Sequence, residues 1–309
     1  MKRSLFVLGI FGAAVGYNAL QINGYHKFHP GVSDLHELPV SMVDSHDLQV
    51  DAGDNVYSRQ LACSHSSIPE GQTNPDLIDL FFSHLQVGAS YTRVKMMPHG
   101  NSVFNGDLGG LQGLYEFRTA DRIYGGLKLA WRQGPMTGSE GKRTMIDGDI
   151  QERIGYTFGC SSHRSKLSLY TGFGFRYLRE NYMPKTGDSV KFKYQEFYVP
   201  VGFLYDYQFS RMFDLGLNFT WMPQVYPTVT IVPLKGCRWI ITDTIANFLV
   251  EVPFTFTSKS RRVSLIFKPF FQYWQDGHTT AETATGLILG LPGNTYLFGG
   301  IEANLCYSF

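Results

Sequence analysis

The feature that most constrains the fold of this chain is an alternation of apolar and polar residues with a period of two. In residues 213–221 every second residue is large and apolar, namely Phe213, Leu215, Leu217, Phe219 and Trp221. The residues between them are small or polar, namely Asp214, Gly216, Asn218 and Thr220. Because successive side chains of a β-strand point to opposite faces of the sheet, this pattern predicts a strand with one apolar and one polar face.

Comparable alternation recurs along the chain from residue 84 onward. The segments lie near residues 84–94, 107–118, 122–132, 149–158, 167–177, 194–207, 213–221, 245–257, 263–274 and 296–309. Long polar breaks lie near 97–106, 133–147, 180–191, 222–243 and 275–295, and short ones near 119–121, 159–165, 208–212 and 258–262. Long loops at one rim and short turns at the other are typical of transmembrane barrels. We therefore predict an all-β fold over residues 84–309, a closed antiparallel transmembrane β-barrel of about 10 strands, with roughly 8–12 compatible with the pattern.

Charge and aromatic content separate this prediction from a soluble β-sandwich, which would also alternate. A sandwich buries its apolar faces between two sheets, and a modest aromatic content fills that core. Here aromatic residues make up 15% of the chain, and charges of both signs recur on the face opposite the apolar one. This arrangement favours lipid outside the barrel and ionic side chains inside it. The net charge of +1, without a basic run, gives no support to a nucleic-acid partner.

The N-terminus predicts an export signal. Met1-Lys2-Arg3 supplies positive charge, and Leu5 to Val15 forms an apolar core too short to span a bilayer. We predict a signal peptide over residues 1–16, cleaved before Tyr17; cleavage after Ala19 and an uncleaved anchor helix are the alternatives. Residues 17–83 show no sustained period and are interpreted as an irregular N-terminal extension or plug.

The last segment carries a resemblance to a known class. Apolar residues fill alternate positions up to the final residue, namely Ile301, Ala303, Leu305, Tyr307 and Phe309. This resembles the terminal strand of Gram-negative outer-membrane barrels, which ends in an aromatic residue. The resemblance implies a bacterial outer-membrane location. It also implies an assembly signal at Leu305, Tyr307 and Phe309, with the lipid bilayer and the outer-membrane assembly machinery as partners. Neighbouring envelope proteins are a further candidate class of partner.

The polar faces predict a balanced ionic network in the lumen. The cationic members are Arg118, Arg122, Lys128, Arg132, Arg153, Lys166, Arg176 and Lys268, and the anionic members are Glu116, Glu180, Glu196, Asp206, Asp214, Glu251 and Glu302. A barrel of about ten strands is narrow, so these groups should lie close enough to pair and to fill the interior. A narrow channel along Gly109, Gly125, Gly172 and Gly202 is the alternative, although the first and second of these glycines face lipid by parity.

Two acidic tripeptides are candidates for chemistry. Asp147-Gly148-Asp149 and Asp276-Gly277-His278 are both placed at the long-loop rim. They resemble the Asp-x-Asp and Asp-x-His pairs of omptins, which are ten-stranded outer-membrane proteases. The resemblance implies that Asp276 and His278 activate a water molecule and that Asp147 and Asp149 help to bind it. In our strand count Asp276 follows the ninth strand, whereas the omptin pair follows the seventh, and turn-forming, solvated aspartates are the alternative interpretation.

The four cysteines fit an exported protein. We expect Cys63, Cys160 and Cys306 at the periplasmic rim and Cys237 in an outer loop. Our hypothesis is that Cys63 bridges Cys160 or Cys306, or that a rim thiol links to a neighbouring protein. No Cys-x-x-Cys or His cluster indicates a metal, and no cofactor is expected. We expect a structural or surface-interaction role rather than an enzyme, with a narrow small-solute channel and an omptin-like rim protease as alternatives.

Overall fold

The computed structural model describes residues 82–98, 102–119, 122–158, 164–232, 234, 237–282, 286 and 288–309. The predicted signal peptide 1–16 lies outside this part of the chain, as does the predicted extension 17–83 apart from Phe82 and Ser83. The described residues form fifteen β-strands, which confirms the all-β prediction. They include no helix that is long and apolar enough to cross a membrane.

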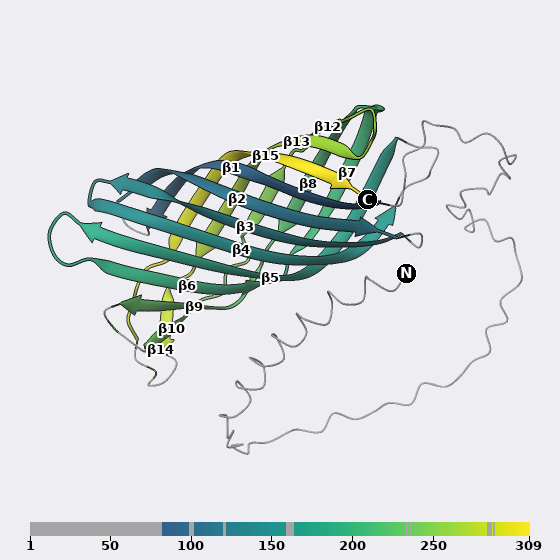
Figure 1. Ribbon diagram of the computed structural model, residues 1–309. Helices are drawn as coiled ribbons and strands as arrows, with labels where there is room; N and C mark the ends of the chain where they lie inside the picture. The colour runs from purple at the N-terminus through teal and green to yellow at the C-terminus, as the bar shows by residue number, and fades with distance from the viewer. Residues whose placement is uncertain are drawn as a thin grey trace, which may run out of the picture. The chain divides into compact units, whose positions relative to one another are not determined.

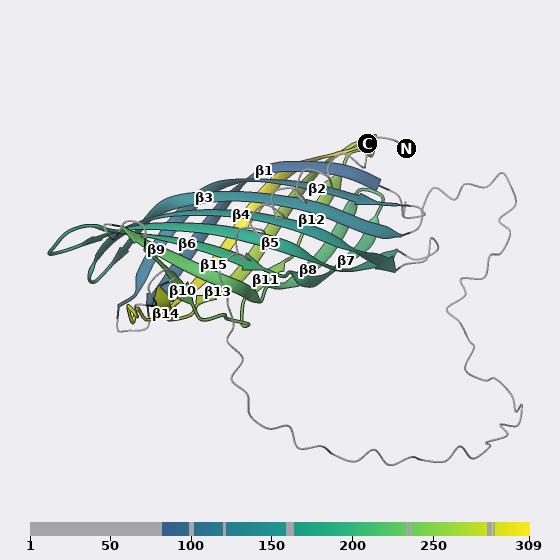
Figure 2. The same ribbon diagram turned by 90° about the horizontal axis from the view of Figure 1, so that it is seen from below.

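The strands build one antiparallel sheet that closes on itself. Their bounds are β1 (Phe82–Pro98), β2 (Phe104–Arg118), β3 (Ile123–Gly138), β4 (Gly141–Phe158), β5 (Ser165–Pro184), β6 (Val190–Tyr198), β7 (Val201–Ser210), β8 (Phe213–Trp221), β9 (Gln224–Val232), β10 (Arg238–Ile241), β11 (Phe248–Glu251), β12 (Phe254–Thr257), β13 (Val263–Asp276), β14 (Thr279–Glu282) and β15 (Asn294–Ser308). β15 pairs with both β1 and β13, which closes the barrel (Figures 1 and 2). The barrel has ten strand positions, as predicted, because several of the shorter strands continue one another.

Prolines cause three of these interruptions. Pro200 separates β6 from β7, Pro223 separates β8 from β9, and Pro253 separates β11 from β12. Proline has no N–H group, so it cannot donate a hydrogen bond to the sheet. The pairing resumes at once on the same neighbour, since β6 and β7 both pair with β5.

The part of the barrel that carries the C terminus has an apolar outer surface, and we call it the membrane section. One ring of outward aromatic residues lies near the short turns, namely Tyr115, Phe158, Phe209, Phe213, Phe256 and Phe309. A second ring lies farther along the strands, namely Tyr91, Trp131, Tyr177, Trp221 and Tyr273. Aromatic girdles at both membrane interfaces are typical of transmembrane barrels, and between these rings the inward side chains are mostly polar.

Beyond the second ring the pattern reverses, and we call this part the outer section. On β1, Arg93 and Lys95 are exposed, whereas Val94 and Met96 point inward and are fully buried. The inward residues of this section form a hydrophobic core, whose members include Phe104, Leu108, Met136, Met145, Leu178, Trp274, Tyr296 and Phe298. The outer section is therefore built like a soluble β-barrel, with water outside and an apolar core inside.

The outer section also corrects the predicted loops. β3 and β4 extend through most of the predicted loop 133–147, β9 and β10 lie within 222–243, and β14 lies within 275–295. The loop prediction was wrong here because the outward residues cease to be apolar at the membrane boundary, whereas the hydrogen-bonded pairing of the strands continues beyond it. Strand pairing depends on main-chain hydrogen bonds, which need no apolar outer face.

Candidate functional site

The interior of the barrel holds most of the charged side chains of the membrane section, beginning at the turn end. A cavity of about 290 Å³ lies inside the turn end. On its wall His84 Nε2 lies 2.9 Å from Glu116 Oε2, and Arg118 donates to Asp206 at 3.1 Å. Asp214 also lines this cavity. Its wall combines these charged groups with apolar side chains such as Leu114, Leu204 and Ile266, and the two pairs of opposite charge lie within contact distance.

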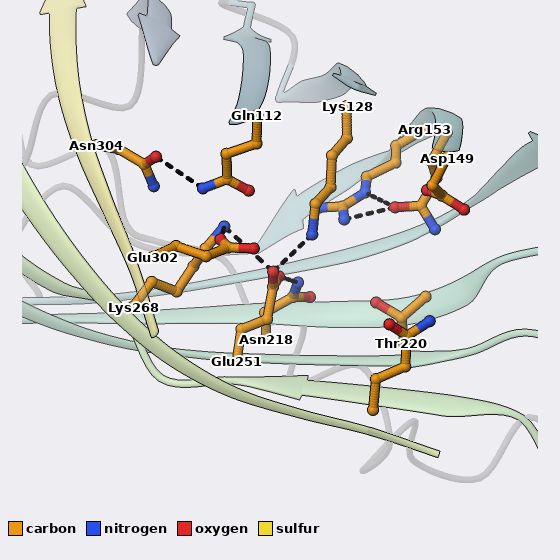
Figure 3. A network of polar contacts seen from close by, with 12 residues as sticks. Gln112, Lys128, Asp149, Arg153, Asn218, Thr220, Glu251, Lys268, Glu302 and Asn304 are labelled. Carbon is orange, nitrogen blue, oxygen red and sulfur yellow. Dashed lines mark hydrogen bonds and ion pairs between the residues drawn. The ribbon is translucent and has the colours of Figure 1, made fainter. Parts of the chain in front are cut away.

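An ion layer closes the cavity above. The Glu251 carboxylate lies 2.6 Å from Lys128 Nζ and 3.2 Å from Lys268 Nζ, and it accepts a hydrogen bond from Asn218. Lys268 also reaches Glu302 at 2.7 Å. Figure 3 shows both lysines reaching the Glu251 carboxylate, Lys128 from β3 and Lys268 from β13, which pairs directly with β11 of Glu251. We refer to Lys128, Asn218, Glu251, Lys268 and Glu302 as the ion layer.

Further hydrogen bonds extend the ion layer across the rest of the lumen. Gln112 Nε2 donates to Asn304 Oδ1 at 2.7 Å (Figure 3). Arg153 donates to Gln151 Oε1 at 2.8 and 2.6 Å, and its guanidinium lies 4.8 Å from the centre of the Tyr170 ring. Polar groups that are buried together in this way remove the space through which solutes would pass.

A carboxylate clamped by two arginines marks the change from the membrane section to the outer section. Asp147 Oδ2 accepts from Arg132 at 2.8 Å, and Asp147 Oδ1 accepts from Arg176 at 2.8 Å. The Arg176 guanidinium lies 4.4 Å from the centre of the Trp274 ring, which is fully buried. Glu196 lies directly opposite Arg176 in the register of β5 and β6. A cavity of about 30 Å³ lies between this clamp and the ion layer.

The aromatic core of the outer section fills the lumen beyond the clamp. Tyr296 packs 6.0 Å from Phe298, measured between ring centres, and its hydroxyl donates to Glu180 at 2.9 Å. Arg143 pairs with the same Glu180 and lies 4.5 Å from the ring centres of both Phe104 and Tyr182. The lumen is thus occupied by ions and amides in the membrane section and by aromatic rings in the outer section.

The two acidic tripeptides are not arranged as a water-binding pair. Asp147 and Asp149 lie in the middle of β4 and point into the barrel rather than standing at a rim, because β4 begins at Gly141. Asp147 is neutralised by its two arginines, and Asp149 accepts from the Tyr198 hydroxyl at 3.0 and 2.9 Å.

The second tripeptide is divided between the interior and the surface. Asp276 is buried and accepts a hydrogen bond from Trp274 Nε1 at 3.0 Å. His278 is exposed, and its Nδ1 lies 3.2 Å from Thr242 Oγ1. No hydrogen bond joins Asp276 to His278 in the described structure. Arg176 lies between the two tripeptides, since it contacts Asp147 and stacks on the tryptophan that binds Asp276.

Comparisons with known proteins bear on the fold. No family model matches the sequence, and no curated protein matches it. Among solved structures, the outer membrane protease OmpT from Escherichia coli aligns with 76% of this chain and 98% of its own, with a TM-score of 0.53 and 12% identity. The translocator domain of the autotransporter NalP from Neisseria meningitidis aligns with 73% of this chain and 88% of its own, with a TM-score of 0.41 and 10% identity. The fold is that of an outer-membrane β-barrel. At 12% identity the likeness to OmpT concerns this fold and not the protease activity.

In an outer-membrane barrel the terminal strand completes the wall. β15 pairs along its whole length with β1, and Leu305, Tyr307 and Phe309 face outward. Cys306 points inward at the turn end, and among the described residues Cys237 and Cys306 carry free thiols. Cys63 and Cys160 lie outside the described residues, so their pairing stays a prediction, as does recognition by the assembly machinery. In the same described part, no group of His, Cys, Asp and Glu side chains is placed to hold a metal ion.

Arg122 and the glycines of the predicted channel track do not line an open lumen. Arg122 lies in the turn before β3 with a φ of 64°, so it belongs to the rim. The glycines proposed as a channel track do not leave a track open. A Cβ at Gly202 would lie 2.7 Å from the Tyr170 ring, so that ring fills the space, while Gly109 faces outward.

The outer section of this barrel carries a basic face that the alternation pattern did not indicate. Lys142 of β4, Arg179 of β5, and Lys191 and Lys193 of β6 all point outward above the second aromatic ring. Arg179 lies directly opposite Lys193 in the register of the sheet. We call these four residues the basic face. None of them forms an ion pair with an acidic residue in the described part of the chain.

Proposed function

We propose that this protein is a closed outer-membrane barrel that does not conduct solutes and that binds an anionic partner at the cell surface through its basic face. The observation that carries the first half is the occupied lumen. The ion layer spans the barrel at Glu251, and the clamp at Asp147 and the aromatic core lie beyond it. The cavity of about 30 Å³ between the ion layer and the clamp is large enough for isolated water molecules but not for a hydrated solute.

The basic face supports the second half. Like charges that stand directly opposite each other on neighbouring strands are destabilising, and Arg179 and Lys193 are such a pair. The outward positions of β4, β5 and β6 in the outer section include no acidic residue within the described chain. A bound polyanion would remove this repulsion, and it would add charge-assisted hydrogen bonds to phosphate, sulfate or carboxylate groups.

Conductance tests the closed lumen. Purified barrel in a planar bilayer is expected to show no channel steps above the background of the lipid, because the ion layer and the aromatic core block the path in series. A porin measured under the same conditions is the positive control. Reproducible single-channel steps from the unmodified protein would contradict this half of the proposal.

Binding to a charged polymer tests the basic face. The barrel in zwitterionic lipid nanodiscs should bind dextran sulfate and not neutral dextran, with an affinity that falls as salt rises. The double variant Lys191→Glu/Lys193→Glu should lower the affinity by about a hundredfold, since two attractive contacts become repulsive. The matched control is Arg93→Glu/Lys95→Glu on β1, which reverses two outward charges of the outer section away from the basic face. An equal loss in both variants would contradict a specific site.

A further inference from the structure

A carboxylate stands in the lipid-facing wall of the membrane section. Glu152 of β4 has the parity of Ile150 and Ile154, which are 37% and 58% exposed. Its direct neighbours in the sheet are Leu127 of β3 and Phe173 of β5. Glu152 therefore points away from the lumen network and into a surface that is otherwise apolar.

Glu152 lies close to the middle of that surface. Toward the turn end, the outward positions of β4 that follow it are Ile154, Tyr156 and Phe158. Toward the outer section they are Ile150 and Gly148, and Gly148 lies opposite Trp131 and Tyr177 of the second aromatic ring. On a strand tilted by about 40°, the six residues from Glu152 to Phe158 cover about 15 Å along the membrane normal and the four from Glu152 to Gly148 about 10 Å, which together match an apolar band about 25 Å tall. Glu152 is thus placed near the bilayer midplane, about 10 Å or more from either interface.

No side chain that the structure describes pairs with the Glu152 carboxylate. Glu152 forms no hydrogen bond and no ion pair with any residue that the structure describes. Ionisable side chains at the midplane are costly, and where they occur they pair with another group or mark a functional site. The carboxylate therefore needs a donor from outside this chain.

An apolar hollow lies on the same surface and is lined by Ile150, the next outward residue of β4 from Glu152. It has a volume of about 390 Å³ and extends over Gly113 of β2 and Gly148 of β4, with Trp131 and Phe175 at its edges. Nothing lies within 3.8 Å of where a Cβ at Gly113 would stand, so the absence of a side chain there creates the hollow. A concave apolar surface beside an unpaired carboxylate is the composition of a recognition site rather than of a plain lipid-facing wall.

We propose that Glu152 and this hollow form a docking site for another integral membrane protein, which places apolar side chains over Gly113 and a Lys or Arg side chain against Glu152. Charge complementarity identifies this occupant. Among the described outward positions of the membrane section there is no Lys, Arg or His, so a second copy of this chain brings no cation to the site. Lipid amines reside at the interfaces, about 10 Å from Glu152, so a headgroup does not reach it.

In-cell photo-crosslinking tests this docking site. A photoreactive phenylalanine analogue replaces Phe173, which neighbours Glu152 and is 71% exposed, in the full-length protein in its native membrane. The same analogue at Leu305, 61% exposed on β15, is the positional control. We expect an adduct of discrete mass from position 173 only. Sequencing of the captured peptide should find a Lys or Arg within an apolar segment.

Variants connect the adduct to the proposed contacts. Glu152→Leu should reduce its yield at least tenfold, as should Gly113→Leu, which fills the hollow. Ile154→Leu and Gly109→Leu are the matched controls and should leave the yield unchanged, since Gly109 also faces open space but does not line the hollow.

The stability of the isolated barrel distinguishes docking from a merely structural role. Glu152→Leu should raise the folding equilibrium constant in vesicles by about tenfold, because it removes a midplane carboxylate, while it abolishes the adduct. Adducts only to lipid, adducts to a second copy of this chain, no adduct, or a yield that Glu152→Leu leaves unchanged would each overturn the proposal.

Discussion

The membrane section and the outer section are built from the same strands but have opposite interiors. In the membrane section apolar side chains face outward and the lumen holds charges such as Glu251 and Lys268. In the outer section Arg93 and Lys95 face outward, and the lumen holds Val94 and Met96. The change occurs within one strand, between successive residues of the same parity. The medium outside the wall, lipid or water, thus determines which face carries the apolar side chains, while the backbone ladder is the same in both.

The largest expected effect comes from breaking the ion layer. Glu251→Ala leaves the Lys128 and Lys268 ammonium groups buried without their shared carboxylate, so the free energy of unfolding should fall by about 3–5 kcal/mol. Urea titration of the barrel in lipid vesicles measures this free energy of unfolding. The triple variant Lys128→Met/Glu251→Leu/Lys268→Met should recover most of the loss, because no charge remains buried. A single variant as stable as the unmodified protein would contradict the pairing.

A smaller effect is the difference in stability cost between replacing a leucine of β5 in the outer section and one in the membrane section. Leu178 is fully buried in the core of the outer section, whereas Leu169 faces lipid and is 47% exposed. Leu178→Ala should cost about 3 kcal/mol because a closed core keeps part of the cavity. Leu169→Ala should cost about 1 kcal/mol, since fluid acyl chains fill the space that it leaves. Equal losses would show that the outer section is not packed as a soluble core.

The boundary between the sections can be located with one added charge. Leu129 and Gln133 share the outward face of β3, on the two sides of Trp131. Leu129→Lys should destabilise the barrel by about 2 kcal/mol, because the ammonium enters hydrocarbon. Gln133→Lys should change the stability by less than about 0.5 kcal/mol, because that position meets water. A similar cost at both positions would move the membrane boundary beyond Gln133.

The smallest expected effect concerns the water-exposed wall of the outer section. Arg93 Nη1 lies 3.4 Å from Asp107 Oδ1, with side chains that are 68% and 50% exposed. Arg93→Ala should lower the stability by less than about 1 kcal/mol, and the loss should shrink further in high salt. A loss as large as that of Glu251→Ala would mean that this pair is shielded from water.

The membrane section could be predicted from the sequence better than the outer section for a physical reason. Strands such as 213–221 combine alternation with an apolar outer face, and this combination was the pattern sought. The outer section also alternates, as Arg93, Val94, Lys95 and Met96 show, but with the apolar residues inward. A search for alternation of either sense would have extended β1 beyond the membrane. The same two-residue parity along β4 is what places Glu152 among the lipid-facing residues.

In the membrane section, local pattern by itself determined that the chain forms strands and, apart from turn residues such as Arg122, which side chains face the lumen and which face outward. Parity needs only the two-residue repeat of the backbone, so it can be read along one strand. Only the tertiary structure decided which lumen residues meet. Lys128 of β3 and Glu251 of β11 touch at 2.6 Å although they lie far apart along the chain. Such contacts depend on the number of strands, their stagger and the diameter of the closed barrel, and these are properties of the whole sheet.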